Sequence, residues 1–158
     1  MKLSENGIKF IKEKEGCRLK AYRCSSNVLT IGYGHTGSDV HSGMLITQDE
    51  ANRLFEADKT IHENNVNKLV KVPLSQGQFD ALVSLEYNIG YGNFSKSSIL
   101  RLVNQKKFKE ARERFLFENP NAATLEEKYK GCWVFNSFKK VELGLVKRRK
   151  EEQKMFWG

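Results

Sequence analysis

A chain of 158 residues is long enough for one domain, or for two small lobes that share a core and bury about two thirds of the unfolded surface. Its composition, 39% hydrophobic and 29% charged, is that of a globular protein, and its apolar runs are too short to span a bilayer. The net charge of +8 favours a polyanionic partner, which could be nucleic acid or an anionic cell wall or envelope.

Cysteine use and the N-terminus bear on the compartment. Residues 1–6 lack the apolar core of a secretion signal, so we expect a protein made and held in a cytoplasm. Cys17, Cys24 and Cys132 form no CxxC pair and have no histidine pattern nearby, which argues against a zinc site or a disulfide framework. Free thiols are expected, with a Cys17–Cys24 disulfide after export as the alternative. The sequence points to no metal and no cofactor.

The first predicted element is a helix over about residues 4–15. Leu3 and Ser4 form a hydrophobic staple and an N-cap at its start, and Gly16 is suited to end it. Within residues 17–46 the apolar positions alternate around a short polar turn. This pattern predicts a β-hairpin, followed by loops and short strands.

Two capping boxes open the helices of a larger helical section. The first lies at 47–50, and its helix ends before Pro73. The second lies at 75–78, and its helix ends at Gly90. Shorter helical patterns follow near residues 96–105, 107–117, 124–131 and 141–156.

These elements predict an α+β protein. We expect a single domain over residues 1–158 with two lobes. A small β-containing lobe takes about residues 16–55. A larger helical lobe takes about residues 56–158 together with the N-terminal helix, and the long helix after the first capping box joins the two.

Glu15 carries most of the functional weight in this sequence. It lies in the last turn of the first helix, where the negative end of the helix dipole disfavours ionisation of a carboxylic acid. Partial burial in a cleft would act in the same direction. A carboxyl group that keeps its proton can serve as a general acid, for example at a glycosidic oxygen. The alternative is a solvated glutamate at a helix end.

Three motifs resemble the phage-type lysozymes of glycoside hydrolase family 24. Glu15 and Thr30 fit the family pattern of Glu, eight residues, Asp, five residues and Thr, but Cys24 stands where the family has Asp. The segment 79–90 is similar to the family's central helix, and 144–152 to its closing Gly-Leu-x-x-Arg-Arg-x-x-Glu. The motifs occur in the family's order and cover most of the chain.

The resemblance implies a lysozyme-like fold and hydrolysis of the β-1,4 bond between N-acetylmuramic acid and N-acetylglucosamine in peptidoglycan. A phage endolysin of this kind lyses its host. The implied partner is the peptidoglycan glycan strand, with transient contact to an anionic envelope, no nucleic acid and a monomeric state. The chain would stay in the host cytoplasm until a separate pore, a holin, released it to the periplasm.

By the same resemblance, Glu15 is the general acid and Thr30 helps to hold the attacking water. Cys24 is the departure, because a free thiol is only a few per cent ionised at neutral pH whereas an aspartate is fully ionised. Arg18 and Arg23 could favour the thiolate. Cys24 then acts as the base or as a nucleophile; the alternative is a spectator in a loop.

Further residues are candidates for substrate contact. Tyr33, Gly34 and His35 are expected to line the cleft, because glycine allows close approach of a sugar to the backbone. A role for His35 in holding a loop is favoured over one as base or metal ligand. Asn88 either contacts substrate or caps a helix. Phe94 either stacks on a sugar or packs in the core.

Two arginines near the C-terminus are candidates to support the acid. The resemblance suggests that either Arg148 or Arg149 packs behind Glu15 and orients it; the alternative is a solvated basic helix face. Glu86 falls near the apolar stripe of its helix, so it faces the cleft or lies at the edge of the stripe.

Three other functions fit parts of the pattern. A lytic transglycosylase needs one glutamate and no second carboxylate, and it leaves 1,6-anhydro ends instead of reducing ends. A wall-binding protein would keep the fold and bind peptidoglycan without cleaving it. A nucleic-acid-binding domain rests on charge alone and predicts steeply salt-dependent duplex binding.

Overall fold

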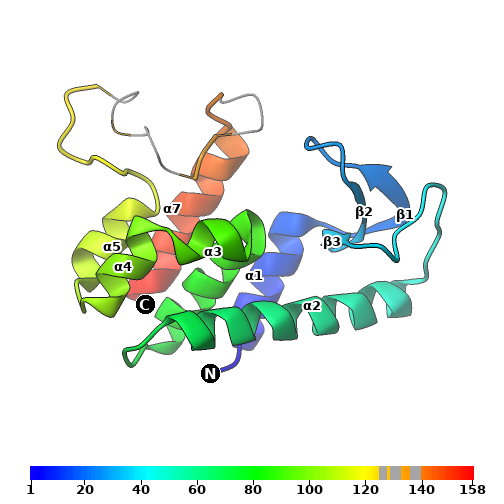
Figure 1. The fold of residues 1–158 in the computed structure, drawn as a ribbon, viewed down its shortest axis with the longest axis horizontal. Coiled ribbons are helices and arrows are strands. Elements are labelled where there is room, and N and C mark those ends of the chain that lie inside the picture. The colour runs from blue at the N-terminus through cyan, green and yellow to red at the C-terminus, as the bar shows by residue number, and fades with distance from the viewer. Residues whose placement is uncertain (125–127, 129–132, 136–139) are drawn as a thin grey trace.

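The computed structural model describes residues 1–124, 128, 133–135 and 140–158. In these ranges a three-stranded antiparallel sheet stands at one end of the molecule and most helices gather at the other, with one long helix running along both (Figure 1). The elements are α1 (Glu5–Glu15), β1 (Arg18–Arg23), β2 (Leu29–Gly32), β3 (His35–Thr36), α2 (Gln48–Leu69), α3 (Gln76–Ser95), α4 (Ser98–Asn104), α5 (Phe108–Arg114) and α7 (Leu143–Trp157). Among the described residues no helix is both long and apolar enough to cross a membrane.

Helix α1 begins and ends as the sequence predicted. The Ser4 hydroxyl caps it by accepting a hydrogen bond from the Gly7 amide over 3.1 Å. Gly16 follows its last turn with φ of +66°, a conformation that glycine adopts readily. Ile11 is fully buried and fixes the face of the helix. Glu15 is therefore held at the point where the chain leaves α1 for the sheet.

The sheet is the predicted hairpin with one short strand added. Strands β1 and β2 pair antiparallel, with Tyr22 opposite Thr30, and β2 pairs with β3, with Ile31 opposite His35. The hairpin turn closes over residues 25–27. Cys24 and Thr30 thus lie on opposite arms of the same hairpin, near its tip.

Both predicted capping boxes are present. Thr47 and Glu50 exchange the two hydrogen bonds at the start of α2, and Ser75 and Gln78 do so at the start of α3. Helix α2 has 22 residues and extends from beside the sheet to the far side of the helical lobe (Figure 1). It is the long connecting helix that the sequence predicted.

Helix α3 is the central element of the helical lobe. Its residues 79–86 are all buried, because the helix packs against α1, α2, α4 and α7. A helix surrounded in this way needs no polar face toward solvent. Gly90 was expected to end it. Instead Gly90 interrupts it with φ of +79° and ψ of +161°, and a further helical segment follows to Ser95.

Two sequence-based expectations fall outside the described residues. The short helix expected near 124–131 lies mostly in the undescribed ranges, and Cys132 lies there as well. Helices were also expected near 96–105, 107–117 and 141–156, and α4, α5 and α7 occupy those regions.

Candidate active site

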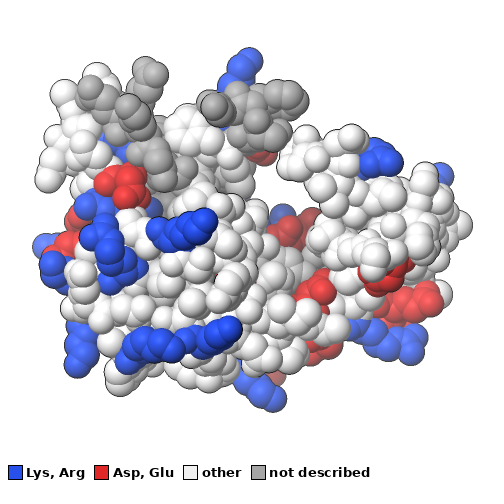
Figure 2. Space-filling view, in the orientation of Figure 1, with Lys and Arg blue, Asp and Glu red and all other residues white. Residues whose placement is uncertain are grey.

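The main cleft lies between the sheet and helices α1, α2 and α3. The space-filling view is visibly hollowed between the β-containing end and the helical end (Figure 2). The cavity has a volume of about 690 Å³ and five of the predicted site residues on its wall. Its lining consists of Glu15, Tyr22, Cys24, Ser25, Thr30, Gly34, Thr36, Asp58, His62, Tyr87, Asn88, Ile89 and Gly90.

Glu15 is anchored in this cleft by Arg148 of α7. Nη1 of Arg148 donates to Oε1 of Glu15 over 2.6 Å, and the Glu15 side chain keeps 18% of its surface exposed. Arg148 itself is buried. Burial alone would lower the pKa of Arg148, but the carboxylates of Glu15 and Glu152 outweigh it and raise this pKa. The guanidinium therefore stays charged and fixes one oxygen of the acid.

A buried polar network holds Arg148 in turn. Oε1 of Glu152 accepts from Nε of Arg148 over 3.2 Å and from the Ser84 hydroxyl over 2.6 Å. Oε2 of Glu152 lies 3.1 Å from Nε of Arg149, whose Nη2 donates to Oδ1 of Asn88 over 2.7 Å. Removing one member of such a network leaves an uncompensated charge in the interior. The network therefore constrains both Glu15 and Asn88 on the cleft wall.

Gly34 lies against the second oxygen of the acid. A methyl group on Gly34 would come within 3.1 Å of Oε2 of Glu15, and the φ of +81° at Gly34 is one that other residues rarely adopt. Since Arg148 occupies Oε1, Oε2 is the oxygen on the Gly34 side of the cleft.

Cys24 and Thr30 face the same cavity from the hairpin. Partial burial opposes ionisation of Cys24, but hydrogen bonds from the Val28 and Ser26 backbone and from Thr30 outweigh it and lower the pKa of the thiol. The shift comes from the turn and from Thr30, not from the two neighbouring arginines that the sequence suggested. Oγ1 of Thr30 lies 3.0 Å from the Val28 carbonyl oxygen, so its single hydrogen is shared between that carbonyl and Cys24.

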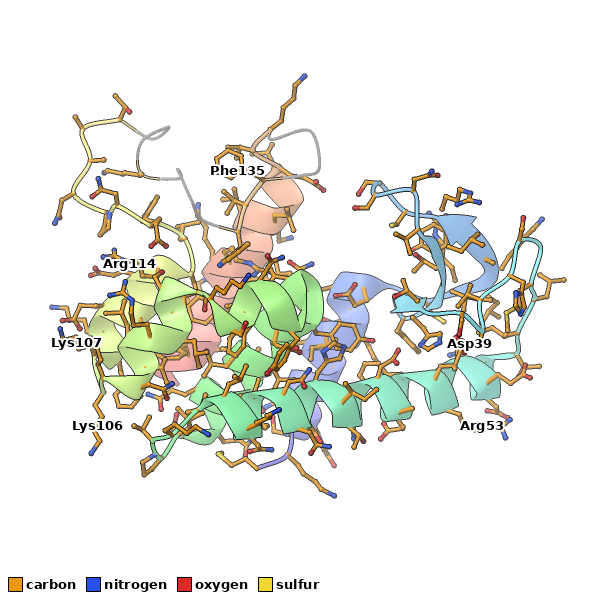
Figure 3. All side chains as sticks on the ribbon, in the orientation of Figure 1. Asp39, Arg53, Lys106, Lys107, Arg114 and Phe135 are labelled. Carbon is orange, nitrogen blue, oxygen red and sulfur yellow. The ribbon has the colours of Figure 1, made fainter. Side chains whose placement is uncertain are left out.

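His35 is a loop-holding residue in this structure. Its Nδ1 lies 2.8 Å from Asp58 of α2, and its Nε2 lies 3.0 Å from Asp39. Asp39 lies in the segment between β3 and α2, where Figure 3 labels it. Burial lowers the pKa of His35, but the two aspartates outweigh it and raise that pKa. His35 thus ties the sheet to α2 and is not among the residues that line the main cavity.

Two further predicted substrate contacts, Tyr33 and Phe94, also lie outside the main cavity lining. The Tyr33 side chain points to the outer side of α1, where its ring packs edge-on against Phe55 and lies beneath the Lys12 amine. Phe94 is 0% exposed within the main hydrophobic cluster, so its ring is not available to a sugar. Only the core-packing alternative for Phe94 fits this position.

The cleft residues that were not singled out from the sequence include Asp58, His62 and Tyr87. Asp58 and His62 are one turn apart on α2, a spacing that puts both on one face of the helix. Burial, then the charges of Asp58 and Glu15, raise the pKa of Tyr87, whose hydroxyl donates to the Tyr33 carbonyl over 2.8 Å. The sequence signal for Asp58 and His62 was their i, i+4 spacing on an otherwise apolar stripe of α2.

A second hollow continues the cleft along the helical lobe. It has a volume of about 470 Å³ and shares Ser25, Asn88 and Ile89 with the main cavity. Trp133 and Phe135 contribute aromatic surface to it, and Phe135 is labelled beside α7 in Figure 3. The two hollows form one extended cleft, which suits a linear polymer better than a small compact ligand.

Comparison with known proteins gives consistent matches along the whole chain. It is 40% identical over 158 residues to the endolysin of Bacillus phage B103, an alignment that covers 99% of this chain and 54% of that protein. It is 36% identical over 156 residues to the endolysin of Acyrthosiphon pisum secondary endosymbiont phage 1, covering 99% and 98%. Among solved structures, the muramidase domain of SpmX from Asticaccaulis excentricus matches with a TM-score of 0.79 and 36% identity, covering 99% of this chain and 98% of that one.

A small antiparallel sheet and a helical lobe, with a glutamate in the cleft between them, define a lysozyme-like α+β fold. The family model of the phage lysozymes matches residues 12–152. The chain belongs to this family, which confirms the predicted fold class and resemblance. It spans about half the length of the B103 endolysin and nearly all of the endosymbiont phage protein.

Proposed function

We propose that this chain is a muramidase that hydrolyses the β-1,4 bond between N-acetylmuramic acid and N-acetylglucosamine of peptidoglycan, and that it serves host lysis by a phage. The observation that carries the proposal is the geometry of Glu15. One of its oxygens is fixed by the buried Arg148, and the other is on the Gly34 side of an extended cleft. Family membership and the endolysin relatives support the substrate class.

Glu15 would act as the general acid. Protonated at Oε2, it would give its proton to the glycosidic oxygen as the bond to the anomeric carbon breaks. Arg148 holds Oε1 throughout, so the carboxylate that results remains hydrogen-bonded and charge-compensated. This arrangement matches what the reaction requires of its acid, namely a fixed position and a stabilised conjugate base.

Cys24 and Thr30 would handle the attacking water. A Cys24 thiolate would accept a proton from the water, and the Thr30 oxygen would accept a second hydrogen bond that holds the water in place. The lowered pKa of the Cys24 thiol supports this role, because it increases the fraction present as thiolate. The water would then enter from the face of the sugar opposite Glu15, with inversion at the anomeric carbon.

A lytic transglycosylase remains the second candidate, since Cys24 stands where the family pattern has an aspartate. That reaction needs Glu15 alone, first as acid and then as base. The two chemistries differ in their products. Hydrolysis leaves a reducing end, and transglycosylation leaves a 1,6-anhydro end.

The test is clearing of purified Gram-negative peptidoglycan, with mass analysis of the released fragments. Wild type should clear the suspension and leave reducing ends, and Glu15→Gln should not clear it. Glu13→Gln, an exposed change on the same helix, is the matched control and should behave as wild type. Anhydro products would favour the transglycosylase. No clearing by folded wild type would favour a wall-binding protein.

Contact with an anionic envelope is a further part of the proposal. Several Lys and Arg side chains lie on the helical lobe in Figure 2, and Lys106, Lys107 and Arg114 are labelled there in Figure 3. Binding through these groups should weaken as salt screens them. A monomeric state and delivery through a separate pore stay predictions, as does the absence of nucleic-acid binding.

A further inference from the structure

His62 of α2 is a cleft residue with an unusual partner. It lines the main cavity, and its Nδ1 is hydrogen-bonded to Oε2 of Glu86 on α3. Glu86 is 0% exposed, and Nδ2 of Asn65 donates to its Oε1 over 2.8 Å. Both oxygens of this buried carboxyl group are thus occupied by side chains of the neighbouring helix.

A carboxylate is seldom placed in the interior without a function, because burial removes its hydration. An apolar residue of similar size would pack between α2 and α3 without needing any partner. The two groups that Glu86 contacts, His62 and Asn65, both lie on α2, one turn apart. The consequence of this placement is that the imidazole of His62 has a fixed orientation.

With Nδ1 held by Glu86, the other ring nitrogen of His62, Nε2, is the one open to the cavity and left for a further partner. The His62 side chain is 22% exposed, and no described residue is hydrogen-bonded to its Nε2. One face of the ring lies against Tyr87, with ring centroids 4.3 Å apart. The cleft therefore presents a fixed polar nitrogen beside an aromatic ring.

We propose that His62 is a glycan-contacting residue that sets affinity for the sugar, and that Glu86 and Asn65 are its positioning residues. Nε2 of His62 hydrogen-bonds a hydroxyl or N-acetyl group of a sugar bound against Tyr87. The inference rests on the proposed function, since it assigns a substrate contact in the same cleft. Asp58, one turn earlier on α2, is already engaged by His35, so His62 is the polar group on this face of α2 that is open to a ligand.

The competing role for a histidine oriented by a carboxylate is that of general base. The two roles separate kinetically. A lost hydrogen bond to the bound sugar raises KM and leaves kcat nearly unchanged, whereas a lost base lowers kcat by about 10²- to 10⁴-fold. Steady-state kinetics on soluble glycan chains from peptidoglycan therefore discriminates between them.

The variants are His62→Phe and Glu86→Gln, with His41→Phe as control at an exposed histidine outside the cavity lining. We expect KM to rise about five- to tenfold in His62→Phe, and in the same direction but less in Glu86→Gln, with kcat within about twofold. His41→Phe should match wild type. Because His62→Phe leaves Oε2 of the buried Glu86 without its partner, the double variant His62→Phe/Glu86→Leu replaces the pair by apolar groups and should show the same rise in KM.

Binding is measured separately by titrating an N-acetylglucosamine tetramer into the non-cleaving Glu15→Gln protein. The imidazole Nε2 resonance of His62 should shift on binding, that of His41 should not, and adding His62→Phe should weaken binding about five- to tenfold. Unchanged KM and unchanged binding in the His62 variants, with wild type still clearing peptidoglycan, overturn this inference alone. A kcat loss of 10²-fold or more at unchanged KM overturns it in favour of the base. Absence of clearing and binding by wild type overturns the proposed function as well.

Discussion

Arg148 and Glu15, 133 residues apart in the chain, are joined by a hydrogen bond of 2.6 Å at the floor of the cleft. The arginine is buried and the carboxyl group is partly open, so the bond fixes the acid from behind without covering it. The same guanidinium contacts Glu152 and Ser84. Three directions of donation from one planar group make Arg148 difficult to replace.

Arg148→Lys should therefore lower kcat by about 10- to 100-fold, because a lysine keeps the charge but cannot bond to all three partners and leaves the acid less well positioned. Melting temperature should fall as well. The measurement is kcat on soluble glycan chains, with Arg101→Lys at an exposed site of α4 as control. A folded Arg148→Lys protein with wild-type kcat would contradict the positioning role.

Cys24 offers a test through the pH dependence of activity. The pKa of its thiol is lowered, so a thiolate base predicts that kcat/KM rises with pH below about 8.5, the pKa of a free cysteine. Cys24→Asp should keep or increase activity and move this rise to about pH 4, where aspartate ionises. Cys24→Ala should lower kcat by about 10²- to 10⁴-fold.

Cys17→Ala is the control, since Cys17 is an exposed thiol outside the cavity lining. Wild-type activity in Cys24→Ala would mean that the thiol is a spectator. Loss of activity in Cys24→Asp would instead indicate a specific need for sulfur, such as a nucleophilic role.

Gly34→Ala tests the close approach between the hairpin loop and the acid. At φ of +81° an alanine costs about 1–2 kcal/mol, and its methyl group would crowd Oε2 of Glu15 at 3.1 Å. Gly43→Ala is matched, because Gly43 has φ of +79° but no atom within 4 Å of the added methyl group. Both variants should lose similar stability, and only Gly34→Ala should lose kcat, by about tenfold. Equal kcat in the two would refute the contact.

Local signals in the sequence were sufficient for most of the elements. The N-caps at Ser4, Thr47 and Ser75 involve residues within three positions of one another, so both partners of each hydrogen bond can be recognised in a short stretch of sequence. The hairpin follows from alternation in the same way. Side-chain direction was harder to predict near glycines with positive φ. Tyr33 lies between Gly32 and Gly34, both of this kind, so strand alternation does not indicate where its ring points.

Phe94 and Glu86 show the two other limits. Phe94 follows the non-helical Gly90, which rotates the later part of α3 relative to its first part, so the helical period no longer predicts its face. Glu86 was recognised as close to the apolar stripe, but its partner His62 comes from another helix, 24 residues away. Pairing between helices depends on their packing, which one sequence does not specify. The choice between Arg148 and Arg149 depended on the same information.

The last prediction concerns stability and pH at His35. Its pKa is raised by Asp58 and Asp39, so the folded protein binds this proton more tightly than the unfolded chain does. The stabilisation is fully present below about pH 6.5, the unfolded value, and is lost as pH rises through the raised folded value. The pKa of Asp39 is lowered by His35, so this partner stays ionised in mildly acidic solution.

His35→Gln should therefore reduce the melting temperature more at about pH 5.5 than at about pH 8.5. Thermal unfolding of wild type, His35→Gln and the exposed control His41→Gln measures the difference, and an equal or larger reduction at the higher pH would show that the ion pairs of His35 contribute nothing.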